Sequence, residues 1–374
     1  MKFIPVGKPV VYPVDYLRVG KALFQKQLSG YSEQYLPRFE NEFAKVAGTS
    51  FSCAVNSGTS AIYLALAALE LPLGTPVAVS TYTNMATIFP ILQLGLIPVP
   101  IDVENVDFNM DPNDLFSIIN SKFGAIVVVH IFGKPANMDA IMSIAEKFKI
   151  PVIEDCAQAH GAKYGGKKVG SFGKAGCFSF YSNKIISTGE GGAISTDDPN
   201  FHEILSRMKS LSFGYQSKFL HESDGYNFRM TNLQAALGLS QISNIEKVLM
   251  EKKRIADKYH SLLCNSENLK LPRITHQGDS VTWMYHLTLS CQHLKCRNLI
   301  INEMQKRKIE LRPGFTPFSE QQKVLEKYKI TTRKTPVASQ VGNSAFYLPT
   351  FTGITLREQN RVCENLLEIV KKLH

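Results

Sequence analysis

The chain has 374 residues, of which 44% are hydrophobic and 20% are charged. This length exceeds the roughly 250 to 300 residues at which one hydrophobic core stops growing, so we expect a large and a small domain. No apolar run precedes a small-residue cleavage site at the start, and no stretch approaches about 18 uninterrupted apolar residues, so we expect a cytoplasmic protein without a membrane span. The net charge is +10, but the basic residues are interspersed with acidic ones, as in 251–254. This mixing argues against nucleic-acid binding and leaves open a general basic surface or attraction of small anionic substrates.

The residues from Gly48 to about Asp198 alternate between short apolar runs and helical stretches. This alternation is typical of a parallel sheet with helical crossovers, so it predicts an α/β domain. Apolar residues at helical spacing predict the crossover helices. The predicted strands are 76–79, 97–101, 125–130 and 151–155, and the predicted helices between them are 59–69 and 139–148.

After Tyr226 the pattern changes. Helical periodicity predicts one helix over 232–249 that continues through 263, whereas alternation predicts a strand over 281–289. Helical spacing returns over 298–308 and 356–373. We therefore place a large domain at 1–245 and a smaller α+β domain at 246–374, and we allow the N-terminal segment to pack on the small domain.

The seven cysteines are odd in number, form no CxxC pair and stand in mostly apolar surroundings. These features argue against a disulfide framework and against a zinc site. We expect buried free thiols and no bound metal.

The first motif is Asn56-Ser57-Gly58-Thr59-Ser60-Ala61, directly before a predicted helix. A turn of small residues that opens a helix presents backbone N–H groups, hydroxyls and the positive end of the helix dipole, all of which suit a phosphate. Ser and Thr also act as ordinary helix caps at such positions. The motif alone leaves both roles open.

The second motif covers residues 153–161, at the carboxyl end of a predicted buried strand. Ligands of open parallel sheets lie at those ends, so Asp155 is well placed for function. A carboxylate that faces a pyridine nitrogen keeps it protonated and makes the ring an electron sink. The alternative is an aspartate that caps the following turn.

The third motif covers residues 177–193 and sets Lys184 between an aromatic run and a Gly-rich turn. A lysine shielded from water has a lowered pKa and becomes a usable amine for Schiff-base chemistry. Lysines beside loops are also commonly solvated. The three motifs in this order are more specific than any one of them alone, because a phosphate turn, a strand-end acid and a lysine are the three contacts that pyridoxal 5′-phosphate (PLP) needs.

With these motifs the chain resembles the DegT/StrS-type nucleotide-sugar aminotransferases, and within them most of all the GDP-perosamine synthases. This family has the aspartate-aminotransferase-like PLP fold (fold type I), with a mostly parallel sheet in the large domain. The resemblance extends over nearly the whole chain. Besides the three motifs, it is carried by Ile4-Pro5-Val6, Pro37-Arg38-Phe39-Glu40, residues 226–236 and Leu348-Pro349-Thr350.

The resemblance implies a role for individual residues. Lys184 matches the lysine that binds PLP and moves protons, Asp155 the partner of the pyridine nitrogen, and Gln158 the partner of the phenolic oxygen of the ring. Asn227 matches a phosphate ligand from the neighbouring subunit, which implies a homodimer with shared sites. The implied phosphate cradle consists of Ser57, Gly58, Thr59 and Ser179.

Other positions are less defined by the resemblance. His160 and Arg229 lie in matching segments and either face the sugar substrate or serve structural roles. Relatives usually carry an aromatic residue that stacks on the cofactor where this chain has Asn84, so either a polar contact replaces the stacking or Tyr82 supplies the ring. Residues 316–322 also depart from the His-Pro that relatives often carry near the substrate.

The function implied by the resemblance is transfer of an amino group from glutamate to a nucleotide-linked keto sugar, most of all a 4-keto-6-deoxy sugar. Relatives that remove a hydroxyl carry His in place of the lysine, so Lys184 favours amino transfer. The alternatives are a 3-keto sugar or a keto-sugar acid as acceptor. A non-catalytic sensor is a further alternative, and the near-complete coverage of the chain by the enzyme fold argues against it.

Overall fold

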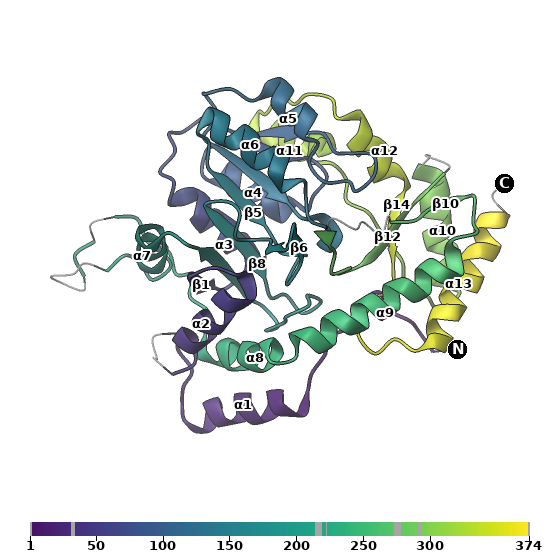
Figure 1. Ribbon diagram of the computed structural model, residues 1–374, viewed down its shortest axis with the longest axis horizontal. Coiled ribbons are helices and arrows are strands. Elements are labelled where there is room, and N and C mark those ends of the chain that lie inside the picture. The colour runs from purple at the N-terminus through teal and green to yellow at the C-terminus, as the bar shows by residue number, and fades with distance from the viewer. Residues whose placement is uncertain are drawn as a thin grey trace.

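The structure, a computed structural model, describes residues 2–30, 34–213, 219–221, 223–272, 278–290 and 294–372. Within these residues the chain forms a large α/β part around a seven-stranded sheet and a smaller part around a four-stranded antiparallel sheet. Figure 1 shows the long helix α9 (Ile245–Leu263) running from the large part to the small one. The predicted fold class is confirmed.

The large sheet has the strand order β1-β9-β8-β5-β4-β2-β3. Strand β9 is antiparallel to both β1 and β8, whereas the other neighbours are parallel. All four strands predicted in this region are present as β2 to β5. The strands are β1 (Phe51–Val55), β2 (Pro76–Ser80), β3 (Ile97–Ile101), β4 (Ala125–Val129), β5 (Val152–Asp155), β8 (Ala175–Ser179) and β9 (Gly192–Thr196).

Helices cover both faces of this sheet and make three layers. In β4, Ile126 and Val128 pack in the core with α5 and α6, whereas Val127 packs on the other face with α3 and α4. Burial on both faces explains why the strand reads as one apolar run. One face carries α3 (Gly58–Ala67), α4 (Met85–Gln93) and α7 (Pro199–Met208), and the other carries α2 (Leu36–Ala47), α5 (Pro112–Ile118), α6 (Met138–Phe148) and α8 (Asn232–Ile242).

The smaller part packs two helices, α10 (Leu294–Lys306) and α13 (Leu356–Lys371), around its sheet. Ile4 is buried in this core and forms a parallel bridge with Ile309, so the N-terminal segment reaches the small part. The sheet has the order β10-β12-β14-β13. Its strands are β10 (Leu269–Lys270), β12 (Tyr285–Leu289), β13 (Arg312–Pro313) and β14 (Ala345–Leu348).

The remaining elements are short or peripheral. A three-stranded sheet has the order β11-β6-β7. Among the described residues, no helix combines the length and the apolar character needed to cross a membrane. These elements are α1 (Pro13–Phe24), η1 (Ile131–Gly133), β6 (Lys163–Tyr164), β7 (Lys167–Lys168), β11 (Gly278–Asp279), η2 (Phe318–Glu320), α11 (Gln322–Tyr328) and α12 (Pro336–Ser344).

The continuous helix predicted over 232–263 is wrong, because the chain breaks between α8 and α9. The Ser243 hydroxyl donates to the carbonyl of Leu239 at 2.9 Å, and the Asn244 amide donates to the carbonyl of Ser240 at 2.9 Å. Short polar side chains of this kind compete with backbone N–H groups for the last carbonyls of a helix. The two polar residues therefore end α8 and let α9 start in a new direction.

Helix α9 contributes to two hydrophobic cores. Val248 packs in a core shared with α2 and α8, whereas Ile255, Tyr259 and Leu263 pack in the core of the smaller part. The domain boundary that we placed after residue 245 falls at the start of this helix. We keep that boundary as a proposal.

The expectation of buried free thiols holds for four of the six described cysteines, Cys53, Cys156, Cys177 and Cys363. It is wrong for Cys264, which is exposed just after α9, and the sixth, Cys296, is half-buried. The thiol of Cys264 has a polar neighbour, the side-chain oxygen of Asn265 at 3.8 Å. Cys291 lies outside the described residues.

Candidate active site

The carboxyl ends of β1, β5 and β8 meet at one edge of the large sheet, next to the start of the antiparallel strand β9. Ser57 follows β1, whereas Asp155 and Ser179 are the last residues of β5 and β8. Parallel strands that share an edge deliver these side chains to the same place, as the sequence predicted.

Helix α3 begins at this edge and approaches β8 very closely. Ser57 is the N-cap, and its hydroxyl accepts a bond of 3.0 Å from the backbone N–H of Ser60. A methyl group added to Gly58 would lie 2.7 Å from the Cβ of Ser179. Only glycine therefore fits here, and the first N–H groups of the helix, including that of Thr59, lack acceptors within the helix. This geometry forms a cradle that suits a phosphate.

Asp155 is held by two hydrogen bonds. It is 5% exposed, and its Oδ2 accepts from the Thr87 hydroxyl at 2.7 Å while its Oδ1 accepts from the N–H of Ala157 at 3.0 Å. Burial raises the pKa of this carboxyl, and the two hydrogen bonds and the charge of Lys184 oppose that rise. A buried carboxylate gains most from a cationic partner such as a protonated ring nitrogen.

Thr87 was not predicted as a functional residue. It lies in the first turn of α4, and it is buried against Asp155 and against the hydroxyl of Thr83 at 2.9 Å. A threonine in a helix has no signature of its own, because its role arises from the strand that packs beside it.

Glu154 faces the other side of β5, since successive residues of a strand point in opposite directions. Its carboxylate accepts from the N–H groups of Gly170, Phe172 and Gly173 at 2.7 to 2.9 Å. It also accepts from the imidazole of His130 at 3.1 Å. The neighbour of Asp155 thus has a structural role and fixes the loop before β8.

Gln158 is 5% exposed, and its Oε1 accepts from the backbone N–H of Phe132 at 2.7 Å. With the oxygen engaged, its Nε2 remains as a donor, and it bonds to no group of the described residues. A fixed amide donor of this kind suits the phenolic oxygen of PLP.

Lys184 lies in the turn that follows β8 and is half-buried. Its Nζ lies 3.8 Å from the centroid of the Trp283 ring. Burial lowers the pKa of Lys184 to about 8, with the charge of Asp155 acting in the opposite direction. An amine with this pKa is partly neutral near physiological pH, as a nucleophilic lysine requires.

The structure gives no stacking ring at the two positions that we considered. Asn84 is exposed and caps α4 by accepting from the N–H of Ala86 at 2.9 Å. Tyr82 is fully buried with its ring against Phe108, Phe132 and Phe315. Asn84 is therefore a helix cap, and Tyr82 is part of the hydrophobic core.

His160 is fully buried among Phe43, Phe178 and Phe180. Burial, followed by the positive charge of Lys184, lowers the pKa of His160 to about 3, so the imidazole is neutral. A neutral ring inside an aromatic core favours the structural role over contact with the sugar.

Asn227 and Arg229 lie beside the phosphate turn of their own chain. The carbonyl of Asn227 accepts from the Asn56 amide at 3.5 Å, and Arg229 forms an antiparallel bridge with Val55. Asn227 is exposed, so its side chain is accessible to a second subunit. Its contact with a neighbouring site stays a prediction.

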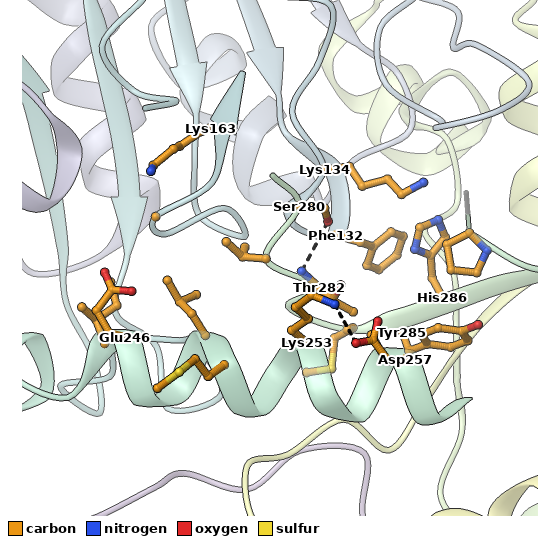
Figure 2. Close-up of a pocket in the computed structure, with 18 of the residues that line it drawn as sticks. Phe132, Lys134, Lys163, Glu246, Lys253, Asp257, Ser280, Thr282, Tyr285 and His286 are labelled. Carbon is orange, nitrogen blue, oxygen red and sulfur yellow. Dashed lines mark hydrogen bonds and ion pairs between the residues drawn. The ribbon is translucent and has the colours of Figure 1, made fainter. Parts of the chain in front are cut away.

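A separate cavity of about 610 Å³ has Phe132 among its lining residues (Figure 2). Its wall is formed by α9, the β6–β7 hairpin and residues 280–282 and 284–286, with Lys134 and His286 near Phe132. The ammonium of Lys253 is paired there with Asp257 at 2.6 Å. Among the described residues, those that we predicted to bind the cofactor do not line this cavity.

The residues at the sheet edge fit PLP by their own chemistry. The close approach of Gly58 to Ser179 shapes an anion cradle, Asp155 is a buried acid, and Gln158 retains a donor. Trp283 was also missed, because it appeared only as one residue of a predicted strand. Its sole signal was that it is the one tryptophan of the chain.

Comparisons with known proteins show which proteins the chain is similar to. The GDP-perosamine synthase of Escherichia coli O157:H7 is 33% identical over 369 residues, which cover 98% of this chain and 99% of that protein. Helicobacter pylori PseC, an aminotransferase involved in the biosynthesis of pseudoaminic acid, has a TM-score of 0.93 at 25% identity and covers 99% of this chain and 100% of its own. GDP-4-keto-6-deoxymannose-3-dehydratase (ColD), solved with bound GDP-perosamine, shares the fold with a TM-score of 0.91 at 23% identity, over 97% of this chain and 100% of its own.

Residues 18–367 match the model of one family along almost the whole chain. The match spans both the large sheet and the smaller part, so it includes every residue at the sheet edge described above. The chain therefore belongs to the DegT/DnrJ/EryC1/StrS aminotransferase family and is a PLP-dependent sugar aminotransferase.

Proposed function

We propose that this enzyme moves an amino group from glutamate to a nucleotide-linked 4-keto-6-deoxy sugar, as a GDP-perosamine synthase does. The identity of 33% across 98% of the chain to such a synthase supports this substrate class. The observation that carries amino transfer is the geometry of the sheet edge, where the buried Asp155 and the close approach of Gly58 to Ser179 lie with Lys184.

The residues of the site have separate tasks. PLP, when bound, supplies an electron sink and carries the amino group between the two substrates. Lys184 would bind the cofactor covalently and would move a proton between cofactor and substrate carbons, because its amine changes protonation near neutral pH. Asp155 would hold the proton of the ring nitrogen, Gln158 would donate to the phenolic oxygen, and the cradle of Ser57, Gly58, Thr59 and Ser179 would bind the phosphate.

Amino transfer is favoured over removal of a hydroxyl. The fold alone does not separate the two, since a 3-dehydratase shares it with a TM-score of 0.91. Lys184 favours amino transfer over removal of a hydroxyl, because a primary amine can bind the cofactor covalently and release it again for each amino group transferred. The lysine is therefore the residue on which the reaction type depends.

The acceptor has a second candidate within the same class. This candidate is a 3-keto sugar, and it is supported by the 32% identity over 67% of this chain to the dTDP-3-amino-3,4,6-trideoxy-alpha-D-glucose transaminase of Streptomyces venezuelae. The residues that we assign to the cofactor are the same for both candidates. We further propose a cytoplasmic homodimer in which Asn227 contacts the cofactor phosphate of the neighbouring subunit.

The cofactor assignment is tested by absorbance of the purified protein with added PLP. We expect a visible band from the lysine-bound cofactor, and its loss in Lys184→Ala. If the band persists in Lys184→Ala, another residue holds the cofactor.

The acceptor is tested with glutamate and a panel of nucleotide-linked 3-keto and 4-keto sugars. We expect nitrogen in the 4-keto-6-deoxy product, detected by mass spectrometry. Amination of a 3-keto sugar alone would select the second candidate, and no amination of any sugar would refute the nucleotide-sugar assignment.

A further inference from the structure

The side chain of Lys184 rests on the only tryptophan of the chain. Its Nζ lies 3.8 Å from the centroid of the Trp283 ring. A cation within about 6 Å of the face of an indole ring is attracted by the electrons of that face. The two residues are nearly a hundred positions apart, so this contact joins the loop after β8 to the segment before β12.

Trp283 is itself held from three sides. Its indole N–H donates to the carbonyl of Asn183 at 2.8 Å, directly beside Lys184. The backbone N–H of Trp283 donates to the carbonyl of Phe132 at 3.1 Å, and the carbonyl of Trp283 accepts from the buried ammonium of Lys252 at 3.0 Å. Trp283 is 5% exposed. The ring therefore has little freedom to turn away from the lysine.

The same ring supports a second cofactor contact. Phe132 stacks on Trp283 with ring centroids 6.3 Å apart and an interplanar angle of 16°. The N–H of Phe132 in turn holds the Oε1 of Gln158 at 2.7 Å. Trp283 thus connects the lysine to the amide that we assign to the ring oxygen of PLP.

We propose that Trp283 is a positioning residue for Lys184, and that its indole face holds the amine whenever the lysine is not joined to the cofactor. The inference rests on the proposed role of Lys184. Its physical reason is that a lysine released from PLP must return to the same atom, and a four-carbon side chain samples many rotamers unless a surface confines it.

Other titratable groups lie near Lys184, and of these Asp155 raises its pKa. Asp155 lies at the end of β5, and the neutral His160 lies in the loop that follows. Lys252 on α9 and Lys8 of the N-terminal segment line a small cavity together with Lys184. Variants of Trp283 leave all four groups in place, so a change in the pH dependence reports on the indole.

The experiment mixes PLP with apo-enzyme and follows covalent attachment by absorbance across pH. In Trp283→Leu we expect attachment at high pH to slow by about tenfold, and its pH midpoint to fall by about one unit, because the ammonium loses the indole face. Trp283→Phe retains an aromatic face and lacks the N–H, so it should attach PLP more slowly with the wild-type midpoint.

Two controls separate positioning from packing. Pyridoxine 5′-phosphate has no aldehyde and cannot be attached covalently. Its affinity therefore measures the noncovalent contacts of the cradle, Asp155 and Gln158, and it should stay within about twofold in Trp283→Leu. Phe315→Leu removes a ring that stacks on Phe132 at 5.5 Å from another side, and it should keep the wild-type attachment rate and midpoint.

Attachment at the wild-type rate and midpoint in Trp283→Leu would overturn the inference. A parallel loss of pyridoxine phosphate affinity would also overturn it, since Trp283 would then act on the fold. Failure of the proposed function looks different, because PLP would then attach to Lys184→Ala as readily as to the wild-type protein.

Discussion

The Thr87 hydroxyl donates a hydrogen bond of 2.7 Å to Oδ2 of Asp155, and both groups are buried. Replacing Thr87 with Val removes the donor at similar volume and leaves one carboxylate oxygen without its side-chain partner. A hydrogen bond to a charged group contributes about 1.5 to 3 kcal/mol, so we expect the half-reaction with the proposed donor, glutamate, to slow by roughly 10- to 100-fold. Stopped-flow absorbance measures this rate. Thr87→Ser keeps the hydroxyl and should recover most of it; equal rates in the Val variant and the wild-type protein would contradict the role.

Gly58→Ala tests the cradle. The added methyl group would lie 2.7 Å from the Cβ of Ser179, so the first turn of α3 must move away from β8. We expect the dissociation constant of PLP to rise by about tenfold or more, because phosphate binding depends on the position of those N–H groups. Equilibrium dialysis provides the measurement. Gly20→Ala is a matched control in an exposed helix with no atom within 4 Å of the new methyl, and an equal effect there would argue against the cradle.

The pKa of Lys184, lowered by burial to about 8, predicts the pH dependence of cofactor attachment. Only the neutral amine is nucleophilic, so the rate should rise as pH increases through about 8 and level off above it. An exposed lysine would have its midpoint near 10.4. Rapid mixing of apo-enzyme with PLP gives the profile. A midpoint near 10 would mean that the amine is solvated before PLP binds.

Much of this site was predictable because it depends on local sequence order. Ser57, Asp155 and Lys184 each lie next to a strand end, and parallel topology brings such ends to one edge whatever the details of packing. Thr87 and Trp283 could not be assigned in this way. Their contacts depend on how α4 packs against β5 and on how a segment from the smaller part folds back onto the loop after β8.

The fold shows a similar limit. Strands buried on both faces appear as apolar runs, so the large sheet was predictable strand by strand. The break between α8 and α9 was not, because Ser243 and Asn244 continue the helical spacing and end the helix only through hydrogen bonds of their side chains. The burial of His160 was likewise invisible, since it follows from Phe43 on α2 packing against Phe178 and Phe180 at the end of β8.

Lys209 and Glu40 form an ion pair of 2.5 Å that ties the start of α2 to the end of α7. Lys209→Met removes the cation and leaves the carboxylate with the N–H of Ala54 at 2.7 Å. Loss of one partner from a buried pair costs about 3 kcal/mol of unfolding free energy. Urea denaturation measures this cost. The exposed pair of Lys253 and Asp257 is the control, and Lys253→Met should leave the urea midpoint unchanged; equal effects would mean that burial of the first pair is unimportant.

Helix α9 carries Val248 into one core and Tyr259 into the other. If one core loses its packing, α9 loses part of its support, and the other core is destabilised as well. The two parts therefore unfold together. Thermal unfolding should therefore be one transition, with equal calorimetric and van't Hoff enthalpies, and two separate transitions would contradict it. A substitution that loosens the small core far from the cofactor should lower the melting temperature of the whole enzyme.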